Sequence, residues 1–153
     1  MKRAIPILAV LLSAGCASWY GGPDEAAREF EKEAGAVESR VREDNARSSL
    51  GKIETSLADY YKSVGSIPPN LDKLVPKYLA EVPALNLPAC GRETNKVEYY
   101  PPDILRDGQV DGTRIRGTGR WGYVYNDSRV VVFVDCLKPS SRGVPWYRER
   151  GVY

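Results

Sequence analysis

A stretch without proline, residues 24–64, constrains the fold of this chain more than any other feature. Pro23 suits the first position of a helix, and the acidic residues after it suit the positive end of the helix dipole. Gly35 and Gly51 are the weak points, each about 1 kcal/mol less favourable than alanine inside a helix. We therefore expect one long helix that ends near Gly65, a residue that favours a left-handed cap.

The two halves of this segment differ in composition. Residues 24–46 are dense in Glu, Lys and Arg and carry only a thin apolar line, formed by Phe30, Ala34, Val37 and Val41. This half is expected to be a solvated extension that acts as a spacer or faces a partner, in a helix of about 60 Å in all. From Leu50 onward an apolar stripe at 3–4 spacing predicts a face packed on the domain core. Its members are Leu50, Ile53, Leu57, Tyr60, Tyr61 and Val64.

After the long helix, the sequence predicts short elements, both helical and strand. Two prolines after Ile67 force a turn, and Asn70 is placed to cap a short helix over residues 71–75. Residues 97–100 form a possible strand, and residues 101–120 are a polar loop. Residues 121–125 and 129–136 are the clearest strands, joined by a three-residue turn at 126–128. Because both faces of these strands are apolar, we expect the helix to cover one side of the sheet.

The first 16 residues have the order of an export signal. A basic start and a short apolar run lead to Leu12-Ser13-Ala14-Gly15-Cys16, which resembles the lipoprotein box of bacteria. The resemblance implies cleavage after residue 15, acyl chains such as palmitate on Cys16, and a tether over residues 16–22. Ala17 and Ser18 lack the Asp that commonly retains such lipoproteins in the inner membrane. The expected location is therefore the outer membrane, facing the periplasm. The alternative is an ordinary secretory leader with a chance cysteine.

With Cys16 assigned to lipid, Cys90 and Cys136 remain. An exported compartment favours oxidation, so we expect a disulfide between them, with two separate reduced thiols as the alternative. The closed loop is expected to stabilise the domain by about 3–4 kcal/mol.

Three segments in order resemble the pseudopilins of type II secretion. They are Tyr60-Tyr61-Lys62-Ser63-Val64-Gly65-Ser66-Ile67-Pro68, then the run from Leu71 through Leu74-Val75-Pro76-Lys77-Tyr78-Leu79 to Val82-Pro83, and Trp121-Gly122-Tyr123-Val124-Tyr125-Asn126. The resemblance implies an α+β fold over residues 23–136, with a long N-terminal helix on a small antiparallel sheet. A pseudopilin instead begins with a hydrophobic membrane helix, which residues 24–46 cannot form because of their charges. The chain therefore looks like a pilin-type head on a lipid anchor, and not like an ordinary filament subunit.

Candidate chemistry is sparse. Asp103, Asp107 and Asp111 lie in a glycine-rich loop, and hard oxygen ligands suit calcium, which major pseudopilins bind in their C-terminal region. Asp135 is a fourth, weaker candidate, and the alternative is a charged turn in which nearby arginines pair with the carboxylates. The Trp121-Gly122-Tyr123-Val124-Tyr125 face is either sheet core or a platform for a glycan or peptide. Residues 137–153 are a basic, aromatic tail with no assigned element. It either binds an anionic surface or is partly disordered.

These features favour a non-enzymatic protein. Histidine is absent, and no serine elbow or phosphate loop is present. Without the leader's Lys2 and Arg3, the 22 basic and 20 acidic side chains balance, which gives no reason to expect nucleic acid as a partner. We expect a lipid-anchored envelope protein that contacts other envelope or secretion-system proteins. The alternative is a lipoprotein that binds a glycan, a peptide or calcium.

Overall fold

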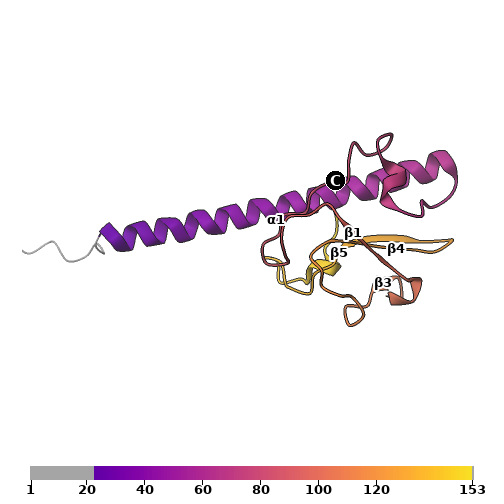
Figure 1. Ribbon diagram of the computed structural model, residues 1–153. Helices are drawn as coiled ribbons and strands as arrows, with labels where there is room; N and C mark the ends of the chain where they lie inside the picture. Colours follow the sequence, from indigo (N-terminus) through magenta and orange to yellow (C-terminus); the bar gives the residue numbers. More distant parts are fainter. Residues whose placement is uncertain (1–22, 153) are drawn as a thin grey trace, which may run out of the picture. The chain divides into compact units, whose positions relative to one another are not determined.

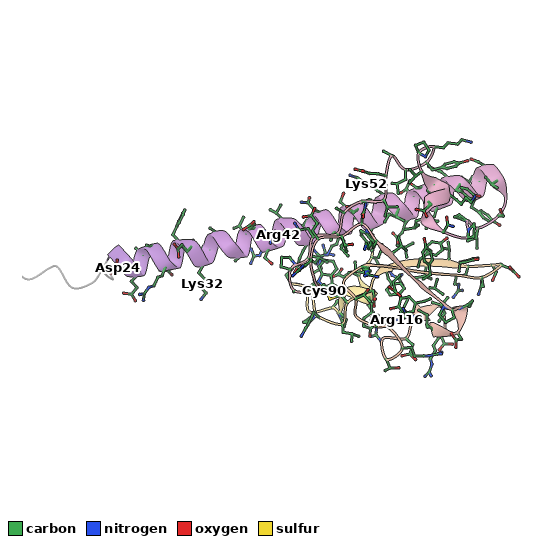
Figure 2. The ribbon with its side chains drawn as sticks, in the orientation of Figure 1. Asp24, Lys32, Arg42, Lys52, Cys90 and Arg116 are labelled. Carbon is green, nitrogen blue, oxygen red and sulfur yellow. A yellow bond between two sulfur atoms is a disulfide. The ribbon has the colours of Figure 1, made fainter. Side chains whose placement is uncertain are left out.

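The computed structural model describes residues 23–152, and Figure 1 shows their arrangement. The chain divides into two units, the first ending at Gly35 and the second starting at Ala36. The described part of the first unit is helical and belongs to α1 (Pro23–Val64). Its side chains from Asp24 onward are exposed, including 73% of Phe30, and Figure 2 shows Asp24 and Lys32 among them. The leader, the tether and Cys16 lie outside the described residues.

In the second unit, α1 buries one face. Ala46, Leu50, Ile53 and Leu57 are all buried, as their 3–4 spacing predicts. The predicted stripe fails at its end, because Tyr61 and Val64 remain at least half exposed. Val37 and Val41 are also exposed. The core-facing part of α1 in this unit therefore begins near residue 46 and ends before its last turn.

The segment after α1 follows its local signals. Gly65 has a φ of 78°, and its N–H donates to the Tyr61 carbonyl at 2.8 Å, which closes the helix with the left-handed cap expected there. The Asn70 side chain accepts from the Lys73 N–H at the start of η1 (Leu71–Leu74), a single turn of 3₁₀ helix. Leu71 and Leu74 are completely buried, so this turn joins the core.

The sheet is mixed, which corrects the expectation of an antiparallel one. Its order is β1 (Val97–Tyr100), β4 (Trp121–Tyr125), β5 (Val130–Val134). β4 and β5 form the predicted antiparallel hairpin, although the Tyr125–Val130 pair makes its loop four residues long instead of three. β1 instead runs parallel to β4. The 20 residues between β1 and β4 make this possible, because they bring the chain back to the same end of the sheet.

Both faces of the sheet are buried. Trp121, Tyr123, Val132 and Val134 pack in one cluster with Leu50, Ile53 and Leu57 of α1. On the opposite face, Tyr100, Val124 and Phe133 pack against Ile104, Val110 and Ile115. This second cover comes from the expected polar loop, which contains η2 (Pro102–Ile104), β2 (Leu105–Arg106) and β3 (Gln109–Val110). The helix therefore covers one side, as predicted, and a small β2–β3 hairpin covers the other.

The C-terminal segment is part of the same unit. It contains η3 (Trp146–Arg148), and Trp146 is buried in the cluster under α1. The N–H of Val152 donates to the carbonyl of Arg47 at 3.2 Å, so the chain end crosses the helix. A Cβ on Gly51 would lie 2.3 Å from the Val152 carbonyl oxygen, so only glycine allows this close approach. Residues 137–152 are thus ordered by packing on the core, and a description of them as a basic tail is incomplete.

Candidate functional site

Two of the three proposed calcium ligands form ion pairs with arginines. Asp103 forms an ion pair with Arg114 at 2.5 Å. The Oδ2 atom of Asp111 lies 3.1 Å from Arg106 Nε without the alignment of a hydrogen bond, so that contact is an ion pair only. Among residues 23–152, no group of three His, Cys, Asp or Glu side chains is arranged to hold a metal ion. The structure therefore shows the paired-charge alternative at Asp103 and Asp111.

Asp107 lies in a tight turn of the β2–β3 hairpin. Asp107 and Gly108 lie between β2 and β3 with φ values of 50° and 79°. Positive φ at two successive residues is what a tight two-residue hairpin turn requires, and Asp-Gly is a preferred pair for it. The side chain and backbone of Thr113 hydrogen-bond Asp111, and with Arg106 and Arg114 they hold the pKa of that carboxyl below its ordinary value.

Asp135 lies away from that hairpin turn, at the centre of a buried hydrogen-bond cluster. Its carboxylate is fully buried and accepts from the Tyr100 hydroxyl at 2.9 Å, the Gly117 N–H at 2.9 Å and the Thr118 N–H at 3.0 Å. The Thr118 hydroxyl also donates to it. We call these residues the Asp135 cluster. Because every donor comes from a segment that precedes β4, the carboxylate fixes the glycine-rich approach to that strand.

Arg47 is the centre of a second cluster, which the sequence did not predict. The side chain is 2% exposed, donates twice to Glu149 and once to Glu43, and lies 5.0 Å from the ring centre of Trp146. Glu149 also accepts from the Ser140 hydroxyl. These residues, the Arg47 cluster, join α1 to the C-terminal segment. The available signal was spacing, since Arg47 stands three residues before Leu50 on the buried face of the helix.

The disulfide is confirmed. Cys90 and Cys136 are bonded, with their Cα atoms 5.6 Å apart. The bond joins the loop before β1 to the residue that follows Asp135 after β5, and Figure 2 labels Cys90 there. The alternative of two separate reduced thiols is not what the structure shows.

The aromatic face is mostly core. Trp121 and Tyr123 are completely buried, and their polar atoms donate to the carbonyls of Pro83 and Pro68, at 2.7 Å and 2.5 Å. These bonds tie two proline-containing loops to β4. Tyr99 and Tyr125 contact the Tyr123 ring, with ring centres 5.6 Å and 5.9 Å from it, and remain about two-fifths exposed. A platform for a ligand would therefore have these two rings only.

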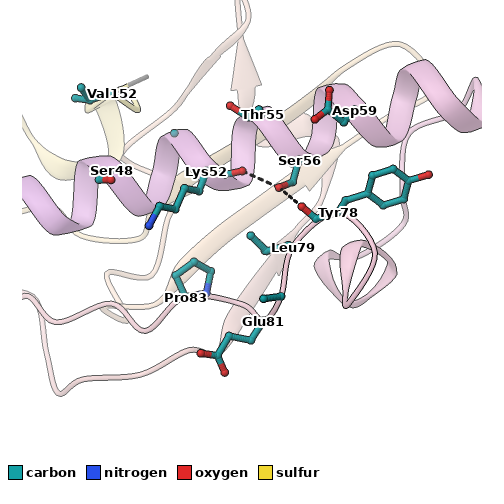
Figure 3. Close-up of a pocket in the computed structure, with 12 residues that line it drawn as sticks. Ser48, Lys52, Thr55, Ser56, Asp59, Tyr78, Leu79, Glu81, Pro83 and Val152 are labelled. Carbon is teal, nitrogen blue, oxygen red and sulfur yellow. Dashed lines mark hydrogen bonds between the residues drawn. The ribbon is translucent and has the colours of Figure 1, made fainter.

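Two of the grooves on the second unit are lined by residues of α1. The larger, of about 780 Å³, runs along α1 and is shown in Figure 3. Lys52 of the helix lies on one side of it, and Pro83 and Glu81 lie on the other. Ser56 bridges the two sides at 2.8 Å by hydrogen bonds to the carbonyls of Lys52 and Tyr78. Its lining contains charged and small side chains.

The smaller groove, of about 390 Å³, lies between the end of α1 and β5. It is lined by Leu57, Ala58, Tyr61, Ile67 and Pro68 on one side and by Ser128 to Val132 on the other, with Glu54, Arg129 and Arg150 also lining it. We call it the β5 groove. Tyr61, the residue predicted to be core and found exposed, belongs to this groove.

Comparison with protein-family models, with curated proteins and with solved structures finds no match to this chain. Within residues 23–152, no helix combines the length and the apolar character that a membrane crossing needs.

Proposed function

We propose that this chain is a non-enzymatic, lipid-anchored protein of the cell envelope that acts through protein–protein contact. The observation that carries the proposal is the combination of a lipoprotein-like leader with a disulfide-bonded α+β unit. A disulfide of this kind belongs to an oxidising, exported compartment, which agrees with the leader.

The sequence resemblance to pseudopilins supports a more specific version of this proposal. A long helix packed on a small sheet, with a proline turn at the helix end, is the plan that the sequence resemblance implied. The mixed sheet departs from the antiparallel one of that plan. We therefore propose a type II secretion or pilus-like system as the class of partner, with the outer membrane as the site of anchoring.

The anchor is tested by the intact mass of the protein extracted from native membranes, with and without reductant. We expect a chain that begins at Cys16, carries acyl chains and gains two hydrogens on reduction. A Cys16→Ser chain, expressed in parallel, should lose the acyl mass and leave the membrane fraction. A wild-type mass that starts elsewhere and lacks lipid contradicts the proposal.

The contact function is tested by photo-crosslinking in cells from exposed positions on the second unit. We expect cross-links to secretion or pilus components from Thr55 or Tyr61, and none from the exposed control position Arg92. Cross-links that are equal at all three positions would contradict a specific docking surface.

The larger groove favours one alternative, a lipoprotein that binds a small ligand. Lys52, Asp59 and Glu81 place charges of both signs around it, which suits a short peptide or a zwitterion. Calcium is a separate ligand prediction at Asp103, Asp107 and Asp111. A rise in melting temperature with 1 mM calcium, lost in Asp107→Asn, would support calcium binding, and no rise would remove it.

A further inference from the structure

The sheet ends at β1, and the outer edge of this strand is unpaired. β1 is the first strand in the order β1, β4, β5, and β4 is its neighbour in the sheet. The N–H of Trp121 donates to the Lys96 carbonyl at 3.2 Å, which fixes where the alternate groups of this parallel pair point. Glu98 therefore bonds to β4, whereas the N–H and C=O of Val97 and Tyr99 point away from it.

The loop that precedes β1 leaves these outward groups free. That loop is joined at the bridge between Leu85 and Thr94, where two backbone hydrogen bonds of 2.8 Å and 3.1 Å hold the two segments together. Among residues 23–152, no hydrogen bond from another segment reaches the backbone of Val97 or Tyr99. Tyr99 is also 43% exposed. The edge is therefore open to an added strand.

A groove of about 620 Å³ follows this edge, and we call it the β1 groove. Val97 and Tyr99 line it from β1, and Val75 and Val82 line it from the loops that follow α1. All four residues are at least partly exposed. Because Val97 and Tyr99 lie on one face of β1, every second side chain of an added strand would point toward this groove. The groove therefore suits apolar side chains at alternate positions of a bound segment.

Two carboxylates exclude acidic side chains from the groove face. Asp72 and Glu81 line the β1 groove on the side of the loops. Within the described part of the chain, neither of them forms an ion pair that would neutralise its charge. A carboxylate on the groove face of a bound segment would therefore be repelled, whereas an apolar side chain would not.

The opposite face of the edge is basic. Glu98 forms ion pairs with Arg116 and with Arg120, the second at 3.2 Å. The two arginine side chains remain 63% and 41% exposed, whereas that of Glu98 is 13% exposed. Lys96 lies on the same face, because it stands two residues before Glu98. A carboxylate placed opposite Glu98 would therefore meet more positive than negative charge.

The same charges disfavour a second copy of this chain at the edge. Two copies of β1 that pair fully would be antiparallel, with Val97 opposite Tyr99 and Glu98 opposite its own counterpart. This register would gather the arginines of both copies on one face. Like charges placed directly opposite each other destabilise a strand pair.

We propose that the open edge of β1, with the β1 groove, binds an extended segment of a partner protein by β-strand addition, and that this segment has the pattern apolar–acidic–apolar. The two apolar side chains enter the groove, and the carboxylate between them pairs with Arg116 and Arg120 on the other face. The inference goes beyond the proposed function, because it adds a contact surface of stated chemistry and does not depend on the lipid anchor.

The test uses the unacylated Cys16→Ser chain and a fluorescein-labelled peptide, acetyl-Thr-Val-Glu-Val-Thr-amide. Its sequence reads the same from both ends, so the test does not depend on strand direction. We expect saturable binding by anisotropy that weakens as salt is raised. A peptide with Lys in place of Glu should bind at least about tenfold more weakly. Arg116→Ala should weaken binding by about threefold, whereas the control Arg92→Ala, at an exposed position outside the groove, should not.

A pair of variants at one position separates strand addition from charge attraction. Val97→Pro removes an outward N–H and leaves the hydrogen bonds between β1 and β4 in place, so binding should weaken by about fivefold or more. Val97→Ala shortens the same side chain but keeps the N–H, and it should bind more tightly than Val97→Pro. Melting temperatures of both variants show whether each is folded.

Hydrogen exchange on the wild-type chain gives a measurement that needs no variant. On peptide binding, exchange should slow at the Val97 and Tyr99 amides and remain unchanged at Glu98, whose amide already bonds to β4. Equal binding of the Lys peptide, equal slowing at all three amides, or no binding at millimolar peptide would overturn the inference. A dimer in solution that Val97→Pro dissociates would assign the edge to a second copy and would also overturn it. These failures are distinct from a failure to find lipid on Cys16, because the probe does not involve a membrane.

Discussion

The two buried polar clusters of the second unit each surround a buried charged side chain with hydrogen-bond partners, but the buried charges have opposite signs. In the Arg47 cluster a buried cation is surrounded by carboxylates, and in the Asp135 cluster a buried carboxylate is surrounded by donors. In the first, the Arg47–Glu149 pair joins side chain to side chain, between α1 and the C-terminal segment. The second accepts from the backbone amides of Gly117 and Thr118 as well as from side chains.

This difference decides what each cluster permits. A cluster of side chains can be replaced as a set by apolar residues of similar volume, because no group is left unpaired. Backbone amides cannot be substituted, so the approach to β4 always needs an acceptor at position 135. The Arg47 cluster is thus exchangeable, whereas the Asp135 cluster is required by the fold.

The largest effect is expected for Asp135→Ala. Four donors lose their acceptor in a fully buried place, and we expect the free energy of unfolding to fall by about 4–6 kcal/mol. Urea unfolding measures the loss, with Asp127→Ala in the exposed hairpin loop as the control. A loss below about 1 kcal/mol would contradict the inference that the fold requires the Asp135 cluster.

Arg47→Met comes next. It removes the guanidinium that donates twice to the buried Glu149 carboxylate, at an expected loss of about 3–5 kcal/mol by urea unfolding. Arg42→Met, which removes an exposed helix ion pair, serves as the control and should change stability by less than about 0.5 kcal/mol.

Breaking the disulfide ranks third. The double change Cys90→Ser/Cys136→Ser opens a loop with a sequence separation of 46 and should reduce stability by about 3–4 kcal/mol. Because Cys136 follows Asp135, hydrogen exchange at Gly117 and Thr118 should accelerate more than at Val152, whose amide bonds to the Arg47 carbonyl. Equal acceleration at all three amides would show that the bridge does not act on one cluster in particular.

The exchangeable nature of the Arg47 cluster is tested by Arg47→Met/Glu149→Leu. Removing both charges should restore the free energy of unfolding to within about 1 kcal/mol of the wild type, measured by urea unfolding as for the single change. No pair of substitutions is expected to rescue Asp135→Ala, and Asp135→Ala/Tyr100→Phe tests that expectation. Rescue of Asp135→Ala by Tyr100→Phe, or no rescue of Arg47→Met by Glu149→Leu, would contradict the difference that we infer between the two clusters.

The smallest effects are expected from pH, and they have opposite signs. Burial raises the pKa of Glu149, but hydrogen bonds from Arg47 and Ser140 outweigh it and hold the pKa below its ordinary value. The stabilisation is therefore present above the unfolded pKa and lost as the pH falls through the folded one. Burial raises the pKa of Tyr100 from 10.0 to about 12, assisted by its bond to Asp135, so that stabilisation is lost as the pH rises through this range. Arg47→Met/Glu149→Leu should reduce the acid dependence of unfolding, and Tyr100→Phe should reduce the alkaline dependence, both measured by urea unfolding across pH.

Local signals explain what the sequence predicted. The left-handed cap at Gly65, the Asn70 cap, the β4–β5 hairpin and the buried stripe from Leu50 to Leu57 all depend on neighbours within a few residues. The disulfide followed from compartment and cysteine count. These features need no knowledge of distant contacts.

The features that the sequence did not predict depend on contacts between distant segments. A 20-residue connection permits either direction for β1, so the parallel pairing with β4 had no local signature. Arg47 looked like one more solvated charge until Glu149, 102 residues later, was placed beside it. For the same reason the C-terminal segment resembled a tail.

The disulfide also has a mechanical consequence. For a protein held at one end by an anchor, a pull on the far end passes through the bond between Cys90 and Cys136 and bypasses the residues between them. At about 3.5 Å per residue, the separation of 46 residues withholds about 160 Å of extension. A force that strips α1 from the sheet would thus leave β1, β4 and β5 inside a closed covalent loop. Under a pulling force, the second unit would therefore extend less while the disulfide is intact than after it is reduced.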